Sequence, residues 1–109
     1  MSIRTVNLTV EVHFQNSISS QDEIIYRIYI NEELLVERSW NWDNKTFLKE
    51  NICIEIDVNK LHQINFESFC LLSNRLVKIS TLNLQNLQCA NEKISIVNFD
   101  PQSITFRIV

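Results

Sequence analysis

The residues of this chain whose types and spacing best suit chemistry lie at positions 37–43, in the segment Glu-Arg-Ser-Trp-Asn-Trp-Asp. Trp40 and Trp42 are two positions apart, so in an extended strand both rings face the same side. On an exposed face they form a platform on which a sugar ring or a partner side chain can stack. Core packing is the favoured interpretation, because Leu34 and Val36 share their alternation. Arg38 shares it as well, and this charge keeps the ligand-binding alternative open.

Groups that could catalyse a reaction are few. The two histidines are His13, expected on the polar face of a strand, and His62, expected to be solvated beside a turn at residues 59–60. Glu32 and Glu33 fall in a predicted hairpin turn, where carboxylates are exposed. No local pattern pairs a nucleophile with a base. The sequence therefore predicts a protein that is not an enzyme, with a small hydrolase as the weaker alternative.

The chain has no glycine, which excludes every motif that depends on one. Phosphate-cradling loops and the nucleophile elbow both need glycine for positive backbone angles or close approach. The three cysteines are an odd number without a C-x-x-C pair, which favours free thiols over disulfides or a zinc site; they are Cys53, Cys70 and Cys89. No cofactor is expected.

Length and charge narrow the class further. A chain of 109 residues with 45% hydrophobic residues suits a single globular domain over residues 1–109. The net charge of −3 disfavours nucleic-acid binding, which needs clustered Lys and Arg. No signal peptide or membrane-spanning run is recognisable. The expected location is a host cytoplasm or a virus particle.

Apolar and polar residues alternate along most of the chain, which predicts that strands position the candidate side chains named above. It is faultless at residues 6–14, where Val6, Leu8, Val10 and Val12 alternate with polar residues. Asn31 suits a hairpin turn, because asparagine tolerates a left-handed backbone. The predicted strands cover residues 6–14, 24–30, 34–42, 51–58, 64–72, 75–84, 94–96 and 104–108.

Helix is the competing interpretation for residues 46–50 and 81–87, but both segments are shorter than a stable helix needs. Short strands at regular turn spacing are typical of a sandwich or barrel. The sequence therefore predicts an all-β fold, an antiparallel β-sandwich of about eight strands with a jelly-roll-like arrangement.

Three segments carry a resemblance to a known family. They are Tyr29 to Trp40, Ile64-Asn65-Phe66-Glu67, and Ser73 to Leu84. Together they resemble the calcium-dependent xylan-binding family of carbohydrate-binding modules, and the first is also similar to the hairpin of small β-sandwich proteins encoded by tailed phages. The resemblance implies a β-sandwich and, as an alternative function, sugar binding by Tyr29, Trp40 and Trp42.

The resemblance also implies calcium ligands, but this chain departs from the family there. Ser68 and Asn74 stand at positions where the family carries acidic residues. A hard cation prefers several carboxylate oxygens. Glu67 and Asn74 are the metal-ligand candidates that remain, and no metal is expected.

The leading expectation is a non-enzymatic structural protein, a phage virion or accessory component acting by protein–protein contacts or self-association. Its grounds are the absent catalytic pattern, the phage-like hairpin and the amino-acid composition. With no glycine and abundant Ile and Asn, this composition is typical of a gene with AT-rich codons. An assembly role uses strand edges, and the strands at residues 6–14 and 104–109 lack the usual edge protection. The final strand is expected to pair within a sheet or with a neighbouring chain.

Overall fold

The computed structural model describes residues 2–14, 23–40, 47–80 and 82–109, and nine strands form within them. No helix among these residues is long and apolar enough to cross a membrane. The strands are β1 (Ile3–Phe14), β2 (Glu23–Ile30), β3 (Glu33–Trp40), β4 (Phe47–Asp57), β5 (Leu61–Leu72), β6 (Arg75–Ile79), β7 (Leu82–Cys89), β8 (Ile94–Asp100) and β9 (Ser103–Ile108).

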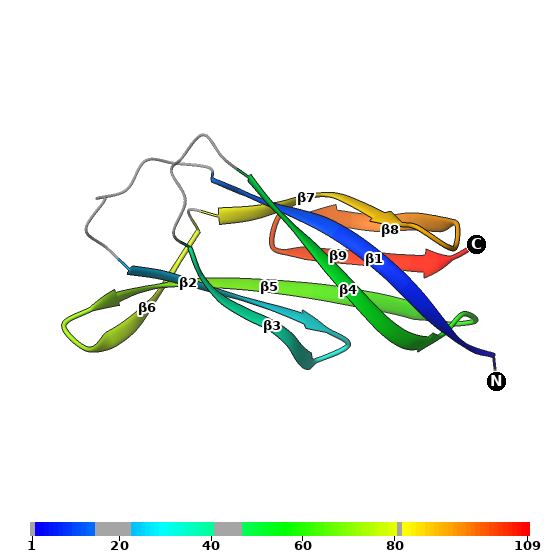
Figure 1. Ribbon diagram of the computed structural model, residues 1–109, viewed down its shortest axis with the longest axis horizontal. Helices are drawn as coiled ribbons and strands as arrows, with labels where there is room; N and C mark the ends of the chain where they lie inside the picture. Colours follow the sequence, from blue (N-terminus) through cyan, green and yellow to red (C-terminus); the bar gives the residue numbers. More distant parts are fainter. Residues whose placement is uncertain (1, 15–22, 41–46, 81) are drawn as a thin grey trace.

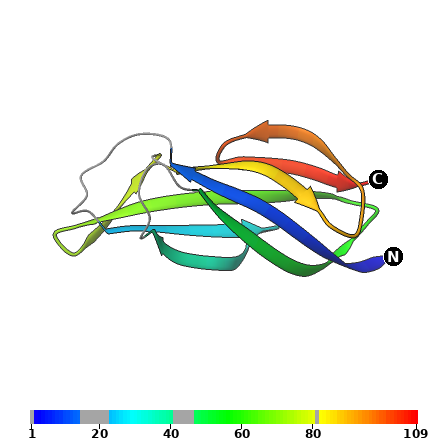
Figure 2. The same cartoon turned by 45° about the horizontal axis from the view of Figure 1, so that its top comes forward.

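Two antiparallel sheets pack against each other in an elongated molecule of 47 × 26 × 21 Å (Figure 1). The smaller sheet has the strand order β4-β1-β7, and the larger has the order β3-β2-β5-β9-β8, with β6 also pairing with β5. Figure 2 shows β8 and β9 as a hairpin at one margin of the molecule. The prediction of an all-β antiparallel sandwich is confirmed.

The described strands number nine rather than about eight, because residues 75–84 were expected to form one strand. In the structure β6 belongs to the larger sheet and β7 to the smaller one. The chain changes sheets between them. Residues 47–50 and 82–87, for which helix was the alternative, are strands.

The core lies between the sheets and follows the alternation of the sequence. Val6, Leu8, Val10 and Val12 of β1 are completely buried. The facing sheet contributes a matching set that includes the fully buried Tyr26. Side chains of a strand point alternately to opposite faces, so the strands inside the sheets, such as β1 and β2, give one face to the core and one to solvent.

The two strands that were expected to be vulnerable edges are interior strands. β1 pairs with β4 on one side and β7 on the other, and β9 lies between β5 and β8. The final strand was expected to pair within a sheet or with a neighbouring chain, and in the structure it pairs within the larger sheet. The free edges of the sandwich belong to other strands.

Two hairpin turns adopt positive φ angles without glycine. Asn31 and Glu32 have φ of 51° and 72°, and Ser73 and Asn74 have φ of 50° and 65°. Two consecutive positive φ angles define the type I′ turn, whose twist matches that of the flanking strands. Asn31 therefore forms the predicted hairpin turn, while Glu32 occupies a position that glycine fills at lower cost.

Replacing Glu32 by glycine is expected to raise the free energy of unfolding by about 0.5–1 kcal/mol, because the left-handed backbone no longer strains a Cβ atom. Glu33→Gly is the matched control. This neighbour lies in extended β3, so its replacement is expected to destabilise the protein by a similar amount. Chemical denaturation of both variants measures the difference, and a destabilising Glu32→Gly would contradict the assignment of the turn.

Candidate functional site

A carboxylate buried between the sheets is the most unusual polar feature of the described residues. Glu50 of β4 is only 4% exposed. Arg38 of β3 donates two hydrogen bonds to it, from Nε to Oε2 at 2.7 Å and from Nη2 to Oε1 at 3.0 Å. The hydroxyl of Tyr26, on β2, also donates to Oε2. This cluster of Glu50, Arg38 and Tyr26 joins an edge strand of one sheet to two strands of the other.

The strand register explains why Arg38 points inward. Arg38 lies opposite Tyr26, and Trp40 lies opposite Ile24, so all four side chains are on the core side of the larger sheet. Because β3 is the outermost strand there, the side chain of Arg38 remains 49% exposed while its guanidinium reaches Glu50. The charge that did not fit a core is thus the partner of a buried carboxylate.

Trp40 is a core residue, and a sugar cannot stack on a ring with 6% exposure. Its ring centroid lies 5.9 Å from that of Phe14 and 6.4 Å from that of Tyr26. Core packing of Trp40 was expected partly because Leu34 shares its alternation. That ground was wrong, since Leu34 is 46% exposed. A β-bulge between Val36 and Leu34 reverses the alternation there. Trp42 lies outside the described residues.

The surroundings of the two tyrosines predict how their hydroxyl groups ionise. Burial, followed by the hydrogen bond to Glu50, raises the pKa of Tyr26 well above its ordinary value. A hydrogen bond to Glu67, followed by desolvation, raises the pKa of Tyr29. Since both folded-state pKa values exceed those of the unfolded chain, this stability is complete below about pH 10 and is lost as the pH rises further.

In an alkaline titration, tyrosinate absorbance is therefore expected to appear together with the loss of native circular dichroism. Tyr26→Phe should remove the steeper part of the pH dependence of unfolding above pH 10. Ionisation of both tyrosines near pH 10 in a protein that stays folded would contradict the placement of Tyr26.

Tyr29 lies on the solvent side of the larger sheet, in a network of charged and aromatic groups. Its hydroxyl interacts with Glu67 and Arg27. Arg27 donates to Glu37 at 2.8 Å, and its guanidinium lies 5.0 Å from the ring centroid of Phe69. The structure thus brings Tyr29 and Glu67 together, but on the opposite face from Arg38 and Trp40.

The two metal-ligand candidates are far apart. Glu67 lies in β5, whereas Asn74 lies in the turn that follows this strand, at least five strand residues or about 17 Å away. Lys78 of β6 lies 3.7 Å from the carboxylate of Glu67. No group of three or more His, Cys, Asp or Glu side chains in the described part of the chain could hold a metal ion.

His62 is buried rather than solvated, which corrects the expectation from its neighbouring turn. Its strand begins at Leu61, so His62 shares the inward face with Ile64. The amide nitrogen of Gln63 donates to Oδ1 of Asn31, which leaves Nδ2 of Asn31 to donate to Nδ1 of His62 at 2.8 Å. The ring proton is therefore on Nε2, which donates to the carbonyl of Asp57 at 2.6 Å.

A pocket of about 410 Å³ lies beside Asn31 and His62, next to the β2–β3 turn. Most of its lining is polar and uncharged, and the exposed Leu61 adds one apolar wall. The lining residues are Asn31, Glu32, Leu61, His62, Gln63 and Thr105.

His13 fits the expectation for the polar face of its strand. Its Nε2 lies 2.7 Å from Oε1 of Glu11, and its ring stacks on Phe47 with centroids 4.9 Å apart. Glu11 also accepts a hydrogen bond from Asn86 of β7. These contacts link the three strands of the smaller sheet across their solvent face.

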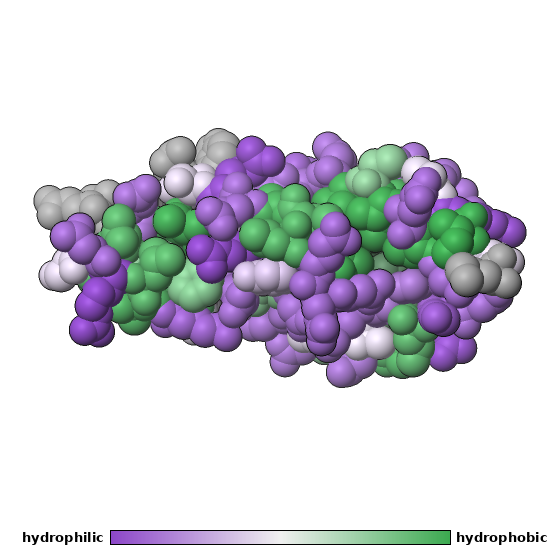
Figure 3. Space-filling view, turned by 90° about the horizontal axis from the view of Figure 1, so that it is seen from below, coloured by the Kyte–Doolittle hydropathy of each residue, from purple (hydrophilic) through white to green (hydrophobic). Residues whose placement is uncertain are grey.

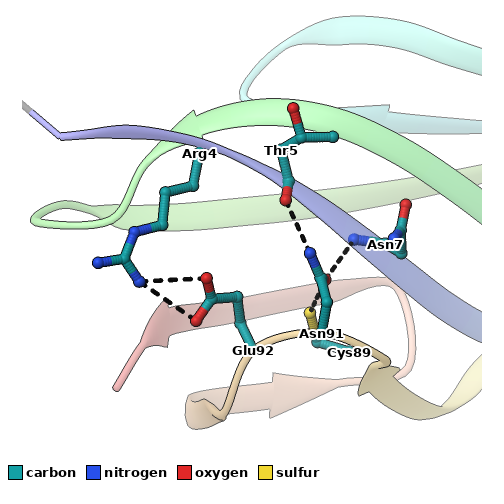
Figure 4. A network of polar contacts seen from close by, with 6 residues as sticks. All are labelled: Arg4, Thr5, Asn7, Cys89, Asn91 and Glu92. Atoms are coloured by element: carbon teal, nitrogen blue, oxygen red, sulfur yellow. Dashed lines mark hydrogen bonds and ion pairs between the residues drawn. The ribbon is translucent and has the colours of Figure 1, made fainter.

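The turn after β7 is tied to β1 by side chains (Figure 4). Oδ1 of Asn91 accepts from the amide of Asn7 at 3.0 Å, and Nδ2 donates to the carbonyl of Thr5 at 2.9 Å. Arg4 adds an ion pair with Glu92 at 3.1 Å. The amide side chain of Asn91 thus takes the place of a peptide group beside β1.

Sequence reasoning missed Glu50 and Tyr26. A signal for Glu50 was present, since it shares the alternation of the apolar residues Ile52 and Ile56. Arg38 is a second charge at an inward position, of opposite sign. Two such charges together predict a buried ion pair.

Comparisons with known proteins add no further assignment. No protein-family model, curated protein or solved structure matches the chain. The functional argument therefore depends on the chain's own residues.

Proposed function

We propose that this protein acts without catalysis, by protein–protein contacts, as a structural or accessory component of a phage particle. One observation carries the proposal, namely apolar side chains that stand exposed along a free strand. Ile96, Val97 and Phe99 of β8 are 42%, 51% and 50% exposed. A group of exposed apolar side chains on a folded protein is typical of a surface that binds a protein partner.

The register of β8 explains why these side chains lack cover. Ile96 lies opposite Phe106 and Phe99 lies opposite Ile104, and both partners are completely buried. Ile96 and Phe99 are thus on the core side of the larger sheet. That sheet extends beyond the three strands of the smaller one, so its outermost strand is left partly uncovered.

The phage setting is supported by composition and by the hairpin. The chain has no glycine and one proline, a bias that follows from AT-rich codons. Its β2–β3 hairpin, Tyr29 to Trp40, is similar to hairpins of small phage-encoded sandwich proteins. These two features support a particle component over an enzyme.

The test is mass spectrometry of purified particles of the phage that encodes the chain. Its peptides are expected at a constant ratio to the major particle proteins and are expected to remain after washing in high salt. Absence of the chain from particles at every stage of purification would overturn the proposal.

Carbohydrate binding is a second candidate function. Its site would lie on the solvent face of the larger sheet instead of at the buried Trp40. The polar pocket beside Gln63 and Thr105 favours it, since amides and hydroxyls both donate to and accept from sugar hydroxyls. Tyr29 on the same face supplies an aromatic ring. Retardation of the wild type, but not of Gln63→Ala, in gels containing xylan would support this candidate, and equal mobility in gels with and without xylan would reject it.

A further inference from the structure

The free strand edges of the described sandwich differ in how well they are protected. β3 and β8 are each disturbed by a β-bulge, and so is the pairing of β7 with β1. β6 is short and carries Arg75 and Lys78. Bulges, shortness and basic residues are the usual protection against pairing with another chain.

β4 is the exception among these edges. Its 11 residues all pair with β1 in one continuous register, from Phe47 opposite His13 to Asp57 opposite Ile3. Its other side has no partner strand in the described part of the chain. A long and regular strand of this kind is a template for another strand.

The direction of the free backbone groups of β4 follows from two hydrogen bonds. The amide of Val58 donates to the carbonyl of Ser2, so this even-numbered residue faces β1. Asn7, opposite Cys53, instead bonds toward the other side, as the acceptor of the amide of Ala90. By alternation, the amides and carbonyls of Lys49, Asn51, Cys53 and Glu55 point to the free edge.

We propose that two copies of this chain pair through β4, antiparallel and related by a two-fold axis at Ile52. The two smaller sheets then become one sheet of six strands, β7-β1-β4-β4-β1-β7. This inference rests on the proposed function, a role in protein–protein contacts, and adds to the exposed side chains of β8 a second contact surface, through which two copies pair. The two-fold axis makes the same surface serve both copies.

Charge complementarity favours a second copy as the occupant of this edge and agrees with the register centred on Ile52. With the axis at Ile52, Lys49 lies directly opposite Glu55 of the second copy, twice by symmetry, and Asn51 lies opposite Cys53. All four residues are on the solvent face, where opposite charges across two strands attract. A register centred on Lys49 or on Glu55 places like charges together.

The inward charge of this edge does not oppose pairing. An inward-pointing charge usually protects an edge because pairing would bury it uncompensated. Glu50 is already compensated within its own chain by Arg38 and Tyr26. Pairing of the edges therefore adds no unpaired charge.

The same side of the sandwich also offers apolar contact. The ion pair of Glu50 with Arg38 shows that the edges β4 and β3 lie on one side. Figure 3 shows the molecule from below the view of Figure 1, which is the side of β3. Hydrophobic surface is visible there between polar side chains. Val36 of β3 and Ile54 of β4, both on the inward faces of their strands, are only partly buried. A second copy that pairs through β4 would cover part of this surface.

Sedimentation equilibrium tests the proposal with charge reversals. The wild type is expected to show a species of twice 12.9 kDa at micromolar concentration. Lys49→Glu and Glu55→Lys should each weaken the dimer about ten-fold, because like charges then oppose each other twice. The double variant should recover the wild-type dissociation constant. Lys60→Glu, the same charge change in an exposed turn, is the control and should change nothing.

Oxidation of paired thiols tests the register. Opposite residues of a hydrogen-bonded pair have Cα atoms about 5.5 Å apart, which suits a disulfide, while diagonal neighbours at about 7–8 Å do not. Asn51→Cys with the native Cys53 should give a covalent dimer. The wild type and Asn51→Cys/Cys53→Ser should not.

The outcomes separate this inference from the proposed function. A monomer at all concentrations, a failure of the double charge reversal to restore the dimer, or a disulfide between two copies of Cys53 in the wild type would overturn the inference. None of these results removes the chain from phage particles, which mass spectrometry examines independently. Absence from particles with an intact dimer would instead overturn the proposed function alone.

Discussion

Replacement of Trp40 by alanine is expected to lower the free energy of unfolding by about 3–5 kcal/mol. Its ring is 6% exposed and packs beside Phe14 and Tyr26. Removal leaves a cavity between the sheets as well as the lost burial of a large ring.

Leu34→Ala is the matched control for that experiment. Leu34 lies on the same strand but is 46% exposed, so its truncation should cost less than about 1 kcal/mol. Thermal unfolding of both variants measures the difference. An unchanged melting temperature for Trp40→Ala would return this ring to the surface and revive its role in sugar stacking.

Replacement of Arg38 by methionine is expected to have an effect of similar size, about 3–5 kcal/mol. Of the side-chain donors in the described part of the chain, the buried carboxylate of Glu50 then keeps the hydroxyl of Tyr26 alone. Removal of the carboxylate charge should cost less than removal of the guanidinium. Arg38 is half-exposed, so water can solvate it once the charge of Glu50 is gone. Glu50→Gln is therefore expected to destabilise the protein by about 1–2 kcal/mol.

Urea denaturation of the two single variants and one combined variant checks this asymmetry. The combined variant Arg38→Met/Glu50→Leu/Tyr26→Phe replaces all three polar groups by apolar ones. It should recover most of the stability lost in Arg38→Met, since an apolar replacement of a buried pair is often neutral. Equal losses in Arg38→Met and Glu50→Gln would show that Glu50 is hydrated in the folded protein.

Alternation was a good guide wherever a strand lies inside a sheet. Val6 to Val12 of β1 and Ile104 to Ile108 of β9 have the predicted inner face, because both neighbours of each strand constrain it. The hairpin turn at Asn31 was also predictable, because asparagine accepts the positive φ that this turn requires.

The edges of the sandwich were less predictable, for a physical reason. A β-bulge adds one residue and reverses the faces beyond it, so Leu34 points to solvent although it shares the alternation of Trp40. The change of sheet between β6 and β7 coincides with a change of phase in the sequence, since the apolar residues stand at odd positions in Val77 and Ile79 but at even positions in Leu82 and Leu84. Edge strands tolerate such irregularities because they are paired on one side only.

The candidate site was predictable only in part. Arg38 was recognised as an exception, but its partner lies 12 positions away on the facing sheet. His62 was misplaced, because its burial depends on Asn31 of another hairpin and not on its own turn. Long-range partners of this kind are determined by the packing of two sheets, which local patterns do not encode.

That two copies of this chain pair through β4 is tested most directly by amide hydrogen exchange at increasing protein concentration. The amides of Lys49, Asn51, Cys53 and Glu55 point to the free edge of β4, while those of Glu50 and Ile52 face β1. We predict that exchange of the first set slows as the concentration rises, whereas the second set is protected throughout. Rapid exchange of the first set at every concentration would contradict pairing through β4.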